Sequence, residues 1–235
     1  MSTHDIATVL EKGDIEIVGR ITDSSNQALF VHVTLDGVTV PACYKTEIGE
    51  RPLWDFPPGL WRREVAAYRL SQLMNVDLIP ITVARRDGPY APGSLQLWVD
   101  DTTGDHYFTL RDRPELEMWF RQLALFDVVA NNTDRKSGHV IFDGSRCWAI
   151  DQGLCFGEDS QLRTVIWEFA GAPLTAQEIA SLERIIHSDA TDFLDLISPD
   201  EIMAVQWRAA QLREIATFPA PNEDSEWPPY PWPLI

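Results

Sequence analysis

The chain has 235 residues with 36 acidic and 19 basic side chains, so its net charge is −17. This charge argues against a nucleic-acid partner, because phosphate backbones require a basic binding face. No apolar stretch approaches the roughly 20 residues that span a bilayer, and residues 1–12 lack a basic segment followed by an apolar one. We therefore expect a cytoplasmic protein without integral membrane association. The three cysteines are too few and too scattered for a disulfide framework.

The first third of the chain is typical of strands joined by tight turns. A mixture of apolar and polar residues before a polar turn predicts a strand over residues 14–21, and period-two alternation predicts one over 28–35; a third strand is expected over 38–44. Asp36-Gly37 is a hairpin turn signal, and Pro41 indicates an edge position or a bulge in the third strand. Helical spacing of apolar residues then predicts a helix over 60–74, and short strands follow over 79–85 and 94–99.

The second half of the chain is typical of helices that flank one small hairpin. Helices are expected over residues 114–129, 175–189 and 199–216, and hairpin strands over 139–143 and 147–150. The order of elements predicts an α+β fold in two lobes. We divide it into an N-lobe over 1–104, a C-lobe over 105–217 and a proline- and tryptophan-rich tail over 218–235, which is either packed on the body or flexible.

Two carboxylates, Asp134 and Asp151, flank the predicted hairpin. Each follows the end of an apolar segment, so both can point into one cleft. Paired carboxylates in a cleft can bind a divalent cation, or one can orient a nucleophile while the other holds the metal. Taken alone, each is also an ordinary turn residue, since Asn, Asp and Gly populate turns. Their pairing across a short hairpin favours the functional interpretation.

The residues upstream of this pair add the other parts that phosphoryl transfer needs. Such transfer requires bound phosphates, metal ions and a carboxylate near the attacking hydroxyl. Lys45 ends a predicted strand and could reach nucleotide phosphates, and Glu64 on the next helix could pair with it. Backbone amides of the turn that contains Ser24, Ser25 and Asn26 could cover the phosphates, although this turn lacks the usual glycines.

These segments together resemble a known family. Asn132-Thr133-Asp134-Arg135 and Trp148-Ala149-Ile150-Asp151-Gln152-Gly153 are similar to the catalytic loop and the metal-binding motif of phosphatidylinositol 3-/4-kinase-related proteins. Relatives include type II phosphatidylinositol 4-kinases, HipA-type toxin kinases and secretory-pathway kinases. The chain most resembles a small actinobacterial group of phosphatidylinositol 3-/4-kinase-like proteins over residues 13–215. The resemblance implies a two-lobed protein-kinase-like fold with a small β-rich N-lobe and a mainly helical C-lobe.

The resemblance also assigns roles to single residues. It implies that Asp134 is the catalytic carboxylate, that Lys45 binds phosphate with Glu64 as its partner, and that Asp151 holds Mg²⁺ or Mn²⁺. Residues 96–100, with Gln96 and Trp98, would form the hinge beside the adenine of ATP. His139 stands where the family has an asparagine as second metal ligand. A neutral imidazole suits magnesium less well than an oxygen ligand.

Three functions remain open on the sequence. The first is an ATP-dependent kinase whose unidentified phosphate acceptor is a protein hydroxyl or a small molecule rather than a lipid, since the chain is short, acidic and without an evident amphipathic membrane helix. The second is a nucleotide-binding pseudokinase, which His139 and the glycine-poor turn favour. The third is a metal-dependent phosphohydrolase that uses Asp127 with Asp134 and Asp151, which leaves Lys45 and Glu64 without a role.

Overall fold

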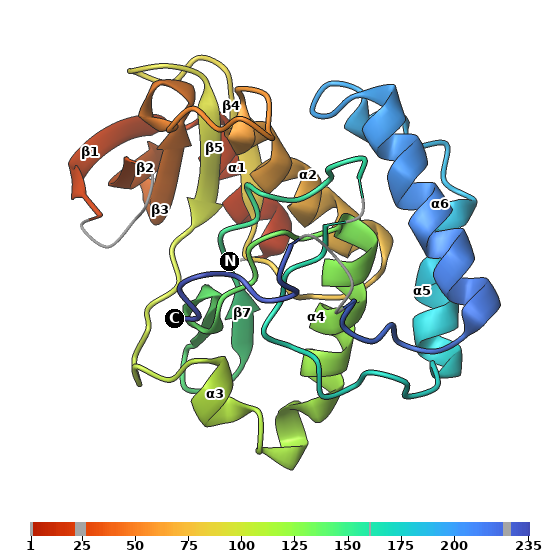
Figure 1. Cartoon of the computed structure of the whole chain (residues 1–235). Helices are drawn as coiled ribbons and strands as arrows, with labels where there is room; N and C mark the ends of the chain where they lie inside the picture. The colour runs from red at the N-terminus through yellow and green to blue at the C-terminus, as the bar shows by residue number, and fades with distance from the viewer. Residues whose placement is uncertain (1, 22–26, 160, 223–226) are drawn as a thin grey trace.

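The computed structural model describes residues 2–21, 27–159, 161–222 and 227–235. Strands dominate the first part of the chain and helices the second (Figure 1). The strands are β1 (Asp14–Arg20), β2 (Ala28–Leu35), β3 (Val38–Thr46), β4 (Thr82–Arg85), β5 (Gly93–Leu97), β6 (Val140–Phe142) and β7 (Cys147–Ala149). The helices are α1 (Thr3–Lys12), α2 (Leu60–Leu73), α3 (Tyr107–Leu110), α4 (Glu117–Ala130), α5 (Ala176–Ile186) and α6 (Pro199–Ile215). Short 3-10 turns cover residues 47–49, 114–116, 137–139 and 191–193.

An antiparallel sheet in the order β1-β2-β3-β5-β4 forms the N-lobe. Val31 and Val33 of β2 are fully buried and belong to the same apolar cluster as Val9 and Leu10 of α1. A strand that buries one face against a helix places its buried side chains two residues apart. The alternation predicted for residues 28–35 is therefore confirmed.

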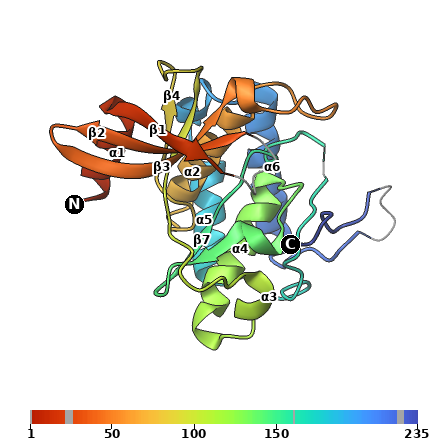
Figure 2. The ribbon, with the colours of Figure 1, turned by 90° about the vertical axis from the view of Figure 1, so that its left-hand side faces the viewer.

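Helix α2 lies between the sheet and the C-terminal helices (Figure 1, Figure 2). It packs on β4 and β5 on one side and on α4 and α5 on the other. Its first turn is capped from a distance, because the carboxylate of Glu50 accepts the backbone N–H groups of Gly59 (2.8 Å) and Trp61 (2.8 Å). A carboxylate at a helix N-terminus satisfies amides that have no partner within the helix. Glu50 thus holds the start of α2 against the N-lobe.

The C-lobe is a set of helices around one large apolar core. Helix α6 packs against α5 and α4, and Phe120, Phe126 and Val129 of α4 are completely buried. Helix α4 ends at Ala130, and its C-cap Asn131 takes a left-handed backbone conformation with φ 51°. That turn directs the chain into the loop that carries Asp134. The hairpin β6–β7 follows and returns the chain to Asp151.

The structure differs from the sequence predictions at two places in the N-lobe. Helix α1 was not expected, although Ser2 and Asp5 form a reciprocal capping box at its start. The edge position indicated by Pro41 is wrong, because β3 lies between β2 and β5. Pro41 has no backbone N–H to donate, but its carbonyl faces the β5 side and accepts from Trp98 N (3.0 Å). Regular pairing with β5 begins one residue later, so the proline is tolerated there.

The turn of the β6–β7 hairpin depends on Asp143. Its carboxylate accepts the backbone N–H groups of Ser145 (2.8 Å) and Arg146 (2.9 Å) and the indole N–H of Trp148 (2.8 Å). Burial alone would raise the pKa of Asp143, but these hydrogen bonds and that of the Ser145 hydroxyl outweigh it and hold the pKa well below its usual range. The ionised form of Asp143 therefore stabilises the folded state.

Substituting Asp143→Asn is expected to lower the free energy of unfolding by about 1 kcal/mol at pH 7, since a neutral acceptor forms weaker bonds. A carboxylate whose folded pKa is depressed contributes stability above its unfolded pKa and loses it as the pH falls. The difference between wild type and variant should therefore shrink steadily below about pH 4. Urea unfolding at pH 7 and pH 3 measures this, and an equal difference at both values would contradict it.

The tail packs on the body where the structure describes it. Ser137 N donates to Leu234 O (2.8 Å), and Thr164 N donates to Pro229 O (3.1 Å). Trp227 stacks on Trp54 of the loop before α2, with 5.7 Å between ring centroids. Within the described ranges, no helix has both the length and the apolar character needed to cross a membrane.

Candidate active site

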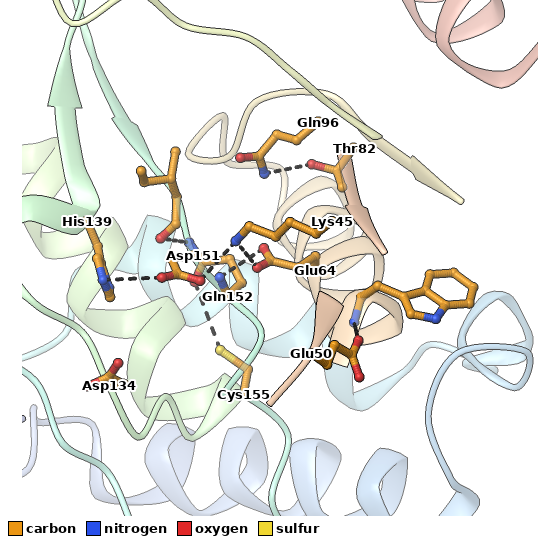
Figure 3. Close-up of polar contacts among 12 residues, drawn as sticks. Lys45, Glu50, Glu64, Thr82, Gln96, Asp134, His139, Asp151, Gln152 and Cys155 are labelled. Carbon is orange, nitrogen blue, oxygen red and sulfur yellow. Dashed lines mark hydrogen bonds and ion pairs between the residues drawn. The ribbon is translucent and has the colours of Figure 1, made fainter. Parts of the chain in front are cut away.

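Three charged side chains from distant segments meet where the sheet, α2 and the β6–β7 hairpin approach one another (Figure 3). The ammonium group of Lys45, near the end of β3, is bonded to the carboxylate of Glu64 on α2. It also donates to Asp151 Oδ1 at 2.9 Å. Lys45 and Glu64 therefore lie in contact, as the sequence predicted, and Asp151 joins them.

The surrounding backbone fixes this triad. Lys45 stands opposite Ser94 in the register between β3 and β5. Glu64 is 2% exposed, and its second oxygen accepts Gln152 N at 2.9 Å, so one glutamate holds both the lysine and the chain directly after Asp151. Asp151 has a left-handed backbone conformation with φ 61°. Such a conformation is costly for a residue with a side chain and is concentrated at functional sites.

The electrostatics of the triad favour the fully charged state. The charge of Lys45 holds the pKa of Asp151 well below its usual range and outweighs the opposing effect of desolvation. Burial alone would lower the pKa of Lys45, but the charges of Asp151 and Glu64 outweigh it and raise that pKa. His139 Nε2 lies 3.4 Å from Asp151 Oδ2, and burial lowers the pKa of His139 to about 4. At neutral pH the triad thus faces an uncharged imidazole.

Asp134 lies apart from the triad, below His139 in Figure 3. Its backbone N–H donates to Asn132 Oδ1 at 3.0 Å, and its carboxylate accepts from Lys136 Nζ at 2.8 Å. Burial raises the pKa of Asp134, although the bond and the charge of Lys136 oppose that shift. The carboxylate is thus both a better base than an exposed aspartate and neighbour to a cation.

A buried ion pair lies under the loop that carries Asp134. Arg135 and Asp127 are both completely buried, and the guanidinium binds both oxygens of Asp127 at 2.9–3.2 Å. The same guanidinium donates to Ile150 O (3.1 Å) and Gln152 Oε1 (2.6 Å), on either side of Asp151. Arg135 therefore fixes the loop to the segment of Asp151. Asp127 serves this pair and does not face the cleft, so its expected approach to Asp134 and Asp151 is wrong.

The residues predicted to bind nucleotide are only partly brought together. Gln96 lies inside β5, and its amide donates to Thr82 Oγ1 at 2.9 Å. Trp98 is the first residue beyond that strand's end at Leu97, and its ring contacts Phe30 edge-on at 4.8 Å. Ser24, Ser25 and Asn26 lie outside the described residues. Among the described residues that were predicted to bind nucleotide, Lys45 and Glu64 contact each other.

Three residues that contact or support the site were not assigned a role from the sequence. Lys136 follows Asp134 by two positions, which was a readable signal for a cation beside the carboxylate. Glu50 caps α2 from a loop nine residues away, and no local pattern reports such a contact. Arg135 is next to Asp134 in the chain, but its burial could not be read from its type, because arginine is rarely buried unless it is paired.

The oxygen and nitrogen donors near the triad decide whether a divalent cation fits there. In the described ranges, no group of three or more histidine, cysteine or acidic side chains is arranged to hold a metal ion. Asp151 offers carboxylate oxygens, and His139 offers one imidazole nitrogen next to them. Magnesium in nucleotide sites is commonly held by one or two carboxylates plus the substrate's phosphates. The residues present fit a metal that arrives with a nucleotide.

The amino-acid sequence is similar to that of a known protein over nearly its whole length. Protein Rv2133c of Mycobacterium tuberculosis is 34% identical over 271 aligned positions, which cover 98% of this chain and 96% of that protein. The chain belongs to the Rv2133c family. No protein-family model matches the sequence.

Solved structures define the fold of this Rv2133c-family member. The Golgi casein kinase structure matches with a TM-score of 0.57 at 12% identity, over 92% of this chain and 78% of that chain. The Helicobacter pylori proinflammatory kinase CtkA gives a TM-score of 0.47 at 9% identity, over 89% of this chain and 94% of that one. The first likeness, with the antiparallel N-lobe and helical C-lobe, confirms the predicted α+β, two-lobed kinase-like fold.

Proposed function

We propose that this protein is an ATP- and divalent-metal-dependent phosphotransferase of the atypical kinase type. The observation that carries the proposal is the triad, in which Lys45 of the sheet contacts Glu64 of α2 and Asp151 after β7. In a kinase-like fold this places a fixed cation and a carboxylate at the junction of the lobes. These are the groups that bind nucleotide phosphates and their metal.

The nucleotide side of the site follows from the triad. Lys45, held by Glu64, would bind phosphate oxygens, and Asp151 with His139 would hold the cation. Bound Mg²⁺ or Mn²⁺ supplies charge neutralisation of the phosphates. Lys45 contacts Asp151 at 2.9 Å, so phosphate binding would replace one partner of the lysine by another. Gln96 and Trp98 remain our proposal for the adenine side, together with Ser24, Ser25 and Asn26 for the phosphates.

The acceptor side of the site is assigned to Asp134 and Lys136. The burial-raised pKa of Asp134 suits it to accept the proton of an attacking hydroxyl. Lys136, 2.8 Å from this carboxylate, supplies positive charge where negative charge builds up on the transferred group. The acceptor is a protein hydroxyl or a small molecule rather than a lipid, since the chain carries a net charge of −17 and anionic membrane surfaces repel it.

The proposal is tested on the lysine. Substituting Lys45→Met is expected to weaken ATP binding by at least about tenfold, because charge-assisted hydrogen bonds contribute roughly 1.5–3 kcal/mol each. Titration calorimetry with Mg²⁺ and a non-hydrolysable ATP analogue measures this, with Lys12→Met on α1 as the matched control. Equal affinity in wild type and Lys45→Met would remove the basis of the proposal.

A nucleotide-binding pseudokinase is the second candidate, and His139 is the observation that favours it. Its imidazole lies 3.4 Å from Asp151, at the position of the expected asparagine ligand. Thermal stabilisation by ATP without phosphate transfer would support this candidate. The phosphohydrolase hypothesis loses support for two reasons. Asp127, which it needs in the cleft, is paired with Arg135, and Lys45, to which it gives no role, contacts Asp151.

Replacing His139→Asn is expected to lower the Mg²⁺ concentration for half-maximal ATP turnover by about tenfold, the scale on which changes around a metal alter its affinity. The reason is that an amide oxygen suits Mg²⁺ better than an imidazole nitrogen. A magnesium titration of ADP release checks this, with Mn²⁺ as the comparison metal. Loss of turnover in the variant would instead show that the imidazole itself is required.

The remaining assignments are proposals of the same kind. We propose closer kinship to phosphatidylinositol 3-/4-kinase-like proteins, on the motifs around Asp134 and Asp151. We also propose the division at 104/105 and 217/218, a cytoplasmic location and the absence of a nucleic-acid partner. The first division falls between the end of β5 and the start of α3, which is compatible with it.

A further inference from the structure

The segment at residues 163–165 runs beside the loop of Asp134. Arg163 N donates to Asn132 O (2.9 Å), and Arg135 N donates to Arg163 O (3.0 Å). Thr164 forms a parallel bridge with Arg135. Because these bonds reach the residues on both sides of positions 133 and 134, the backbone places Arg163 directly alongside Asp134.

No carboxylate of the described residues pairs with the guanidinium of Arg163. Its Nε–H is buried and donates to no residue in the described ranges, and the guanidinium carbon lies 5.8 Å from the centroid of the Trp227 ring. The chain holds 36 acids for 19 bases, and Arg121 and Arg135 of the C-lobe are paired with acids. Arg208 also has a buried nitrogen without a partner in the described ranges, but its other nitrogens donate to the carbonyls of Val129 and Gly157. A buried donor without a partner costs roughly 1–3 kcal/mol, so its retention needs an explanation.

The surroundings of Arg163 define what would satisfy it. The positive charge of Arg163 acts to lower the pKa of Asp134. The Asp134 carboxylate is hydrogen-bonded to Lys136. A cavity of about 450 Å³ adjoins the same loop at Asn131 and Thr133, and the acids Asp55, Glu158 and Asp159 line it together with the ion pair of Arg63 and Glu201. These acids oppose a polyanion. A single localised anionic group therefore fits best.

We propose that Arg163 binds an anionic substituent, a carboxylate or a phosphate, of the molecule whose hydroxyl is placed at Asp134. This inference rests on the proposed function, because it names the chemical class of the acceptor. Trp227 of the tail covers one face of the guanidinium, and Trp54 of the N-lobe loop stacks on that indole. The planar ring restricts Arg163, and since Nε is enclosed, the two terminal guanidinium nitrogens are the donors left for a planar or tetrahedral anion.

The test uses inorganic phosphate as the probe and the whole 235-residue chain. Phosphate is titrated by calorimetry into wild type, with and without saturating Mg²⁺ and a non-hydrolysable ATP analogue. A site in the millimolar range is expected under both conditions. Substituting Arg163→Gln should weaken phosphate binding at least about tenfold, the equivalent of one charge-assisted hydrogen bond. Arg163→Lys should keep part of the affinity, and the exposed Arg213→Gln should leave it unchanged.

The outcomes separate the inference from the proposed function. If the analogue does not bind wild type, the proposed function fails, whereas phosphate binding that depends on Arg163 would still support the anion site. If the analogue binds and phosphate affinity is equal in wild type and Arg163→Gln, the inference is overturned. A tenfold loss of analogue affinity in Arg163→Gln also overturns it, because the arginine would then serve the nucleotide. Melting temperatures of the variants check that they fold, and Arg163→Lys gives the answer if Arg163→Gln does not.

Discussion

Replacing Asp134→Asn is expected to lower kcat for ATP turnover by about 1,000-fold while the affinity for ATP changes less than about threefold. A positioned general base contributes roughly 10²–10⁴-fold to rate, and the amide keeps the shape of the carboxylate but cannot accept the proton. Asp134 touches Lys136 and Asn132 rather than the triad, so the nucleotide-side contacts remain in the variant. A loss confined to kcat marks an interaction that is made in the transition state.

The measurement pairs ADP release with calorimetric binding of the ATP analogue. Asp112→Asn, an exposed aspartate outside the site, is the matched control and should keep wild-type turnover. Asp151→Asn should differ from Asp134→Asn, because it loses metal-dependent nucleotide binding as well as turnover. Turnover that survives in Asp134→Asn at more than a tenth of the wild-type rate would exclude Asp134 as the base.

Substituting Arg135→Met is expected to lower the free energy of unfolding by about 3–5 kcal/mol. Removing one partner of a buried ion pair leaves the other charge buried without compensation, and Asp127 is completely enclosed. The guanidinium also binds Ile150 O and Gln152 Oε1, so the variant loses the link between the loop of Asp134 and the segment of Asp151. Nucleotide affinity should therefore fall together with stability.

Chemical unfolding of three variants checks this account. Arg213→Met removes an exposed pair with Glu183 and should cost less than about 1 kcal/mol. The double variant Arg135→Met with Asp127→Leu should recover a large part of the loss, because no uncompensated charge remains. A single variant as stable as Arg213→Met would show that the buried pair is not what joins the two segments.

The sequence predicted those parts of the fold that depend on local periodicity. The alternation around Val31 and Val33 reports burial on one sheet face, and the turn at Asp36-Gly37 fixes the neighbouring strand. The order of Lys45, Glu64, Asp134 and Asp151 predicted a kinase-like arrangement, and the fold agrees with it.

Other features depend on contacts that no local pattern contains. Glu50 accepts a backbone N–H at the start of α2 from across a loop. Arg163 is positioned by backbone hydrogen bonds to the loop of Asp134. Asp127 is the converse case, a residue that the sequence placed in the site and the structure places elsewhere. Its position at a helix end allowed it to face the cleft, but pairing with Arg135 turned it inward. Which distant polar groups meet is decided by the packing of the lobes, and a single sequence does not report it.

The most direct measurement of the central claim is the melting temperature of the protein with ATP, with and without Mg²⁺ or Mn²⁺. A ligand that binds the folded state raises stability by about 2.7 kcal/mol at a hundred times its Kd. We predict a metal-dependent rise in wild type that is reduced in Lys45→Met and that loses its metal dependence in Asp151→Asn. No rise in wild type with either metal would contradict the proposed nucleotide site.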